Sequence, residues 1–200
     1  MPTAIFSNFR LHREPAWRPM VSKSDRAIPD QWRDWLSDTG SLTQRLLDAS
    51  EGKLSVQIIR QCLDAPRLSE RLALGLAPRR LALIREVILL GDGVPWVYAR
   101  SVLPMTTLTG SLRKLRRLDN RPLGALLFQS PSMTREPVEV ACHTSANAKL
   151  PVVLGHIDTP LWGRRSVFRL NRKPLLVSEI FLPDFKPYNQ SLTFGYGRNL

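Results

Sequence analysis

Residues 81–104 read LALIREVILLGDGVPWVYARSVLP, two apolar and β-branched runs on either side of Asp92-Gly93. An Asp-Gly pair between such runs is a strong signal for a two-residue turn, so the sequence predicts a β-hairpin here. Side chains alternate between the two faces of a strand, and both faces of the first run are apolar. We therefore expect both faces of this hairpin to be covered by other parts of the protein.

Each face of the first predicted strand carries one charge, Arg85 on one face and Glu86 on the other. If Asp92-Gly93 forms the whole turn, Arg100 lies directly across from Arg85 on the same face. Two like charges at such a position are unfavourable unless an anion binds between them, and the planar fork of arginine suits a carboxylate. The alternatives are that Glu86 or another internal carboxylate neutralises these arginines, or that the register differs.

A second hairpin is predicted at residues 163–182, where two apolar runs flank Asn171-Arg172. Glu179 is a carboxylate in an otherwise apolar row of the second strand, and this turn places Arg164 opposite it. One interpretation is a buried pair of Arg164 and Glu179. The other is that Glu179 accepts a hydrogen bond from a substrate hydroxyl, or acts as a base with a raised pKa.

The rest of the sequence alternates between helical and strand patterns, which indicates an α+β fold on an antiparallel sheet. A domain is predicted at 28–188, after an irregular lead-in at 1–27 and before a C-terminal extension at 189–200. Within the domain we expect helices at 30–36, 41–47, 66–76 and 107–118, a short helix after Pro122, and strands at 53–61 and 133–142.

The protein is strongly basic, with 200 residues, a formal net charge of +12 and a pI near 10.8. Such a charge favours an anionic partner, either nucleic acid, an anionic membrane or a small acidic substrate. The sequence has no RNA-binding or helix-turn-helix motif, and no apolar run approaches the ~20 residues that span a bilayer. The histidines are scattered, so we expect no metal. Cys62 and Cys142 are expected to be reduced thiols of a cytoplasmic protein.

Several segments, in this order, resemble the chorismate lyase family, and together they cover residues 28–188. They are LIREVILL at 83–90, PW at 95–96 with Arg100 and Pro104, PLG at 122–124 with LF at 127–128, LWGRRS at 161–166, and KPLLVSEIFLP at 173–183. Each segment alone is a weak signal, whereas their joint order makes the resemblance specific.

The resemblance implies a single α+β domain with an antiparallel sheet of about six strands, flanking helices and helical flaps over an internal pocket. It also implies the activity of a chorismate pyruvate-lyase, which eliminates pyruvate from chorismate to leave 4-hydroxybenzoate, the first committed step toward ubiquinone. We expect this enzyme to need no cofactor, to act as a monomer, to bind no nucleic acid and not to insert stably into a membrane.

The resemblance also implies roles for five residues. Arg85 matches the arginine that binds the ring carboxylate, and Glu179 matches the acid that contacts the 4-hydroxyl. Arg100 matches a second pocket arginine, which we expect to stabilise the departing pyruvyl group. The backbone of Leu123 helps to hold the ligand, and Leu42 stands where the family commonly has a methionine in the pocket wall.

One alternative is a non-catalytic sensor of small aromatic acids, because the same fold resembles the effector domain of certain bacterial transcription regulators. Such a sensor would normally carry a winged-helix domain as well, for which we expect no room in 200 residues. Within the enzyme interpretation, Ala99 stands where relatives often have glycine.

Overall fold

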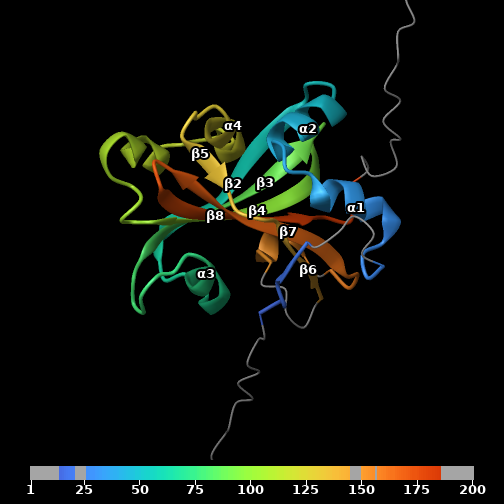
Figure 1. The fold of residues 1–200 in the computed structure, drawn as a ribbon. Helices are drawn as coiled ribbons and strands as arrows, with labels where there is room; N and C mark the ends of the chain where they lie inside the picture. The colour runs from blue at the N-terminus through green and yellow to red at the C-terminus, as the bar shows by residue number, and fades with distance from the viewer. Residues whose placement is uncertain (1–13, 21–25, 145–149, 156, 186–200) are drawn as a thin grey trace, which may run out of the picture.

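An antiparallel sheet of eight strands forms the centre of the protein, in the order β1-β6-β7-β8-β4-β3-β2, with β5 paired to β7 (Figure 1). The computed structural model describes residues 14–20, 26–144, 150–155 and 157–185. The strands are β1 (Arg18–Pro19), β2 (Leu54–Asp64), β3 (Ala82–Gly91), β4 (Val94–Pro104), β5 (Met133–Arg135), β6 (Glu139–His143), β7 (Leu161–Leu170) and β8 (Lys173–Phe181). The predicted α+β class is confirmed. The sheet has more strands than the expected six, because it includes two very short ones, β1 and β5.

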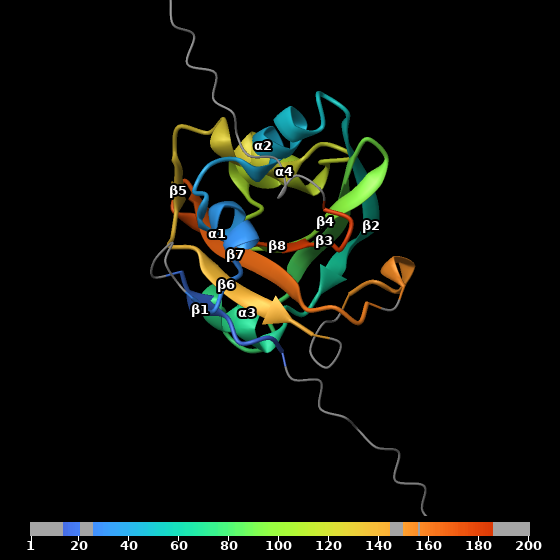
Figure 2. The ribbon, with the colours of Figure 1, turned by 90° about the vertical axis from the view of Figure 1, so that its right-hand side faces the viewer.

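Helices cover both faces of this sheet. They are α1 (Asp30–Ser37), α2 (Leu42–Ala49), α3 (Leu68–Ala73), α4 (Leu123–Phe128) and two 3-10 helices, η1 (Gly110–Arg116) and η2 (Val152–Leu154). Figures 1 and 2 both show α2 and α4 on one side of the sheet and α3 on the other. We call these two sides the α2 face, which carries Arg85 and Val87, and the α3 face, which carries Glu86 and Ile88.

Both predicted hairpin turns are present. Asp92 and Gly93 have φ angles of 49° and 80°, and Asn171 and Arg172 have φ angles of 50° and 63°. Two successive residues with positive φ are the signature of a type I′ turn, whose twist matches that of the flanking strands. Asn and Asp tolerate this conformation better than other non-glycine residues, which explains why the local sequence identified both turns.

The register of the first hairpin differs from the prediction. Gly91 pairs with Val94 and Leu90 with Pro95, but Leu89 pairs with Val97, so Trp96 is an extra residue in β4. This is a β-bulge, and it follows Pro95, which has no N–H to donate to the ladder. The indole ring of Trp96 fills the space beside Gly91, where an added Cβ would lie 2.3 Å from it. From the bulge onward, each β3 residue therefore faces a partner one position later than expected.

The predicted strand at 133–142 is divided into β5 and β6, which both pair with β7. The backbone N–H of Glu136 donates to Val167 O at 2.9 Å between them, so the chain stays close to β7 throughout. In the predicted helical stretch at 107–118 the structure has the 3-10 helix η1. Residues 18–19 of the predicted lead-in form β1, and the predicted extension at 189–200 lies outside the described residues.

Candidate active site

A band of polar side chains crosses the α2 face between two apolar clusters. One cluster includes Val87 and Phe181, and the other includes Leu83 and Leu175. Between the two clusters, Arg85 on β3 pairs with Ser101 on β4, and the same cross-strand row continues through β8 to Ser166 on β7. Glu179 on β8 and Arg164 on β7 face each other in the next row on the same face. The polar band consists of Arg85, Ser101, Arg164, Ser166 and Glu179. Polar groups between two apolar clusters are costly to bury, so each must be paired or must bind something.

Arg85 occupies the β3 end of the polar band and is 2% exposed. Its guanidinium donates to Gln61 Oε1 at 2.9 Å and to the backbone oxygens of Asp119 at 2.7 Å and Arg121 at 3.2 Å. All three acceptors are neutral, and no carboxylate among the described residues forms an ion pair with Arg85. Burial lowers the pKa of Arg85, which the more distant charge of Asp119 opposes. This buried cation therefore lacks an anion, and two of its five N–H groups remain free to bind one.

Glu179 lies on β8, opposite Arg164 on β7 as predicted. Glu179 Oε2 accepts a hydrogen bond from Arg164 Nε at 2.7 Å, and Arg164, which is 1% exposed, also donates to the backbone oxygens of Trp35 and Asp38 at 2.7 Å. The other carboxylate oxygen of Glu179 has no partner among the described residues. Glu179 is thus both the partner of a buried arginine and an acceptor with one oxygen available to a ligand.

Leu42 and Leu123 are the first residues of α2 and α4, and both are buried. The two helices begin close together, because a Cβ added at Gly124 would lie 2.7 Å from Thr43 Oγ1. Leu42 belongs to the apolar cluster with Val87, whereas Leu123 belongs to the cluster on the other side of the polar band. The structure therefore brings Leu42 and Leu123 to the same face as Arg85 and Glu179.

Arg100 is not on this face, so the prediction that it shares a face with Arg85 is wrong. The bulge at Trp96 places Arg100 opposite Glu86 instead, on the α3 face. Its Nε contacts Glu70 Oε1 and its Nη1 contacts Glu86 Oε1, each at 2.6 Å. Burial opposes the charge of Arg100, but these two glutamates outweigh it and raise its pKa. The neutralising carboxylates that were the alternative interpretation are thus present, at least for Arg100.

The sequence reasoning did not single out Arg135, on β5. Its Nε donates to Ser166 Oγ at 3.0 Å, its Nη1 donates to Thr39 O at 2.8 Å, and its guanidinium lies over the ring of Phe168. Arg135 therefore joins the β7 end of the polar band. The strand pattern at 133–142 was recognised, but the face on which Arg135 lies depends on pairing with β7, which that segment alone does not specify.

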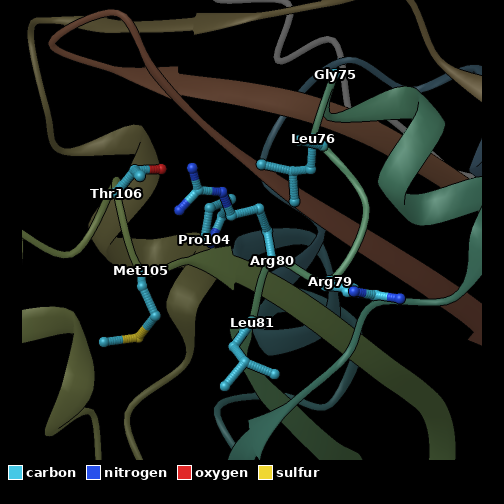
Figure 3. Close-up of a pocket in the computed structure, with 9 residues that line it drawn as sticks. Gly75, Leu76, Arg79, Arg80, Leu81, Pro104, Met105 and Thr106 are labelled. Atoms are coloured by element: carbon cyan, nitrogen blue, oxygen red, sulfur yellow. The ribbon is translucent and has the colours of Figure 1, made fainter.

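A hollow of about 380 Å³ lies away from this band, between residues 75–81 and the end of β4 at 104–106 (Figure 3). Figure 3 shows Arg80 pointing toward Thr106 and Arg79 pointing the other way. The hollow contains none of the predicted site residues. In the part of the chain that the structure describes, no three His, Cys, Asp or Glu side chains are grouped to hold a metal, and no helix is long and apolar enough to span a membrane.

Several solved structures share this fold at low sequence identity. The effector domain of PhnF from Mycobacterium smegmatis aligns with a TM-score of 0.53 and 16% identity, over 74% of this chain and 91% of that one. A GntR-family transcriptional regulator from Bacillus cereus aligns with a TM-score of 0.52 and 11% identity, over 70% of this chain and 99% of that one. At such identities the likeness concerns the fold alone.

The sequence comparisons identify the family. A probable chorismate pyruvate-lyase of Aromatoleum aromaticum is 41% identical over 164 residues, which are 78% of this chain and 86% of that protein. A second, from Marinobacter nauticus, is 44% identical over 152 residues, 76% of each chain. The family model of chorismate lyase matches residues 16–191, which include the whole polar band. The chain therefore belongs to the chorismate lyase family.

Proposed function

We propose that this protein is a chorismate pyruvate-lyase, which converts chorismate to 4-hydroxybenzoate and pyruvate. The observation that carries the proposal is the buried cation of Arg85, which pairs with no carboxylate among the described residues and lies on the same face as Glu179 in a member of this family. Chorismate is a dianion with one hydroxyl group. A buried arginine and a carboxylate with a free oxygen are complementary to a ring carboxylate and that hydroxyl.

The proposed roles follow from the contacts of each residue. Arg85 binds the ring carboxylate with the N–H groups that its three neutral acceptors leave free. Glu179 accepts a hydrogen bond from the 4-hydroxyl through the oxygen that Arg164 does not contact. Leu42 contributes apolar surface to the pocket wall, and the backbone of Leu123 helps to hold the ligand.

The proposed reaction is a concerted rearrangement of bound chorismate. The hydrogen on C4 moves to the methylene carbon of the enolpyruvyl group while the bond between C3 and the ether oxygen breaks. The side chain leaves as pyruvate, with a new methyl group and a new ketone, and the ring becomes aromatic. No external base or oxidant is needed, so the main task of the protein is to hold the substrate in the reactive conformer.

Replacing Glu179 by Gln separates this route from one in which Glu179 is the base at C4. A lost general base lowers kcat by about 10²- to 10⁴-fold. We expect a much smaller change in kcat, because the concerted route needs no base. We expect a higher KM, because Gln offers one acceptor oxygen where Glu179 offers two, to Arg164 and to the 4-hydroxyl. Steady-state kinetics with a thermal denaturation control measure both, and a kcat loss of several orders of magnitude in a folded variant would contradict the concerted route.

The product is expected to inhibit the enzyme strongly and to leave slowly. 4-Hydroxybenzoate keeps the two groups proposed to contact Arg85 and Glu179, so it retains a large part of the binding energy of the substrate. Progress curves should bend well before chorismate is exhausted, and added 4-hydroxybenzoate should act as a competitive inhibitor. Linear progress curves with inhibition only at high millimolar product would refute this expectation.

The decisive test of the function uses purified protein with chorismate alone. Pyruvate, detected with lactate dehydrogenase, and 4-hydroxybenzoate should form in equal amounts without added metal or cofactor. Binding of both compounds without turnover would instead favour the sensor interpretation. We further propose that the protein is cytoplasmic, which the free thiols of Cys62 and Cys142 support and which cell fractionation would test. We also propose that it is a monomer, which sedimentation would test.

A further inference from the structure

The second carboxylate of chorismate, on the enolpyruvyl group, also needs a cation in the site. The sequence suggested Arg100, but that guanidinium lies on the α3 face with two glutamates as partners. Arg164 is on the correct face but is already paired with Glu179. The cation must therefore be sought among the arginines of the α2 face for which the described part of the chain provides no carboxylate partner.

Arg135 meets this condition. Its three hydrogen bonds go to neutral oxygens, the hydroxyl of Ser166 and the backbone carbonyls of Thr39 and Gly40. Its Nη2 has no partner among the described residues. Burial and the neighbouring charge of Arg164 both lower the pKa of Arg135, and the charges of Glu179 and Asp38 oppose this without forming an ion pair. The Ser166 hydroxyl, the Thr39 carbonyl and the Phe168 ring fix the guanidinium, so it is pre-organised to bind an anion.

The position of Arg135 suits a ligand that also reaches Arg85. Ser166, which holds the Arg135 guanidinium, lies in the same cross-strand row as Arg85, with β4 and β8 between them. Three strand spacings separate their backbones by about 14 Å. Figure 2 shows β5 and β2 toward opposite lateral ends of the sheet, with α2 and α4 above the strands between them. Arg85 and Arg135 thus approach the polar band from its two ends, and Glu179 lies on β8 between them.

We propose that Arg135 binds the enolpyruvyl carboxylate of chorismate, and this inference rests on the proposed function of the site. Arg85 and Arg135 then hold the two carboxylates of the substrate, while Glu179 receives the hydroxyl. The carboxylate that Arg135 contacts leaves with pyruvate. Arg135 therefore contributes to the binding of substrate and not of 4-hydroxybenzoate, whereas Arg85 contributes to both.

This difference provides a test by ligand binding. The probes are 4-hydroxybenzoate and 3-(carboxymethoxy)-4-hydroxybenzoate, a stable aromatic dianion with an ether-linked carboxylate at the corresponding position. Arg135→Gln should weaken binding of the dianion about 10- to 100-fold, as expected for the loss of a charge-assisted hydrogen bond. Its Kd for 4-hydroxybenzoate should stay close to that of the wild type. KM for chorismate should rise in parallel with the Kd of the dianion.

Arg169→Gln is the matched control, because Arg169 is a β7 arginine that is 41% exposed and already paired with Glu136. It should change neither Kd. If Arg135→Gln does not fold, Arg135→Lys keeps the charge without the fork and should still weaken only the dianion. An equal rise in Kd for both ligands, or no rise for either, would overturn the proposal. The role of Arg135 would then be limited to its hydrogen bonds with the backbone of Thr39 and Gly40. A wild type that binds both probes without turning over chorismate would refute the enzyme function separately.

Discussion

Replacing Arg85 by Gln is expected to lower kcat/KM for chorismate by about 100- to 1000-fold. The variant loses the positive charge and the two N–H groups that the backbone and Gln61 leave free, on Nε and Nη1. Together these are worth about 3 to 4 kcal/mol if each charge-assisted hydrogen bond contributes about 1.5 to 2. Because the ring carboxylate remains in the product, the Kd for 4-hydroxybenzoate should rise by a similar factor. Steady-state kinetics and calorimetric titration measure the two effects.

Arg85 also supports the segment before α4, because it donates to the backbone oxygens of Asp119 and Arg121. The Arg85→Lys variant tests whether the loss is merely structural. Lys keeps the positive charge but has three donors instead of five, so it cannot both hold these backbone oxygens and bind the ligand as Arg85 does. We therefore expect it to recover only part of the lost affinity. Wild-type efficiency in a folded Arg85→Gln variant would show that the ring carboxylate binds elsewhere.

The sequence predicted the pairing of Arg164 with Glu179, because this pairing depends on a single hairpin without a β-bulge. Asn171-Arg172 determines the turn between β7 and β8, and the register runs without interruption from Leu170 and Lys173 to Arg164 and Glu179. The pair was therefore found from turn chemistry and strand alternation alone. The buried pair of Arg164 and Glu179 is confirmed. The interpretation of Glu179 as an acceptor for a substrate hydroxyl stays a prediction.

The two errors concern arginines whose faces depend on longer-range structure. Arg100 follows the bulge at Trp96, and one inserted residue moves every later side chain of β4 to the opposite face. Pro95 was visible in the sequence as a residue that disturbs a ladder, but the packing of Trp96 beside Gly91 was not. Arg135 was missed because its neighbours, Ser166 and Phe168, are more than 30 residues away in sequence. Local patterns specify which residues alternate, whereas tertiary pairing specifies where they lie.

Arg100→Met is expected to reduce the free energy of unfolding by about 3 to 5 kcal/mol, the largest loss of stability that we predict for a single substitution. The Arg100 side chain is 7% exposed and lies between Glu70 and Glu86, whose side chains are 5% and 10% exposed. Removing the arginine leaves two buried carboxylates without a cation. Urea denaturation followed by circular dichroism measures the change.

A triple variant separates this structural effect from any role in the reaction. Combining Arg100→Met with Glu70→Gln and Glu86→Gln removes all three buried charges, and replacing a buried charged triad by neutral groups is often tolerated. We expect the triple variant to regain much of the lost stability and, because Arg100 lies on the α3 face, to keep most of its turnover. Restored stability with turnover still reduced by orders of magnitude would mean that Arg100 acts on the substrate through the sheet. An Arg100→Met variant as stable as the wild type would contradict the buried triad itself.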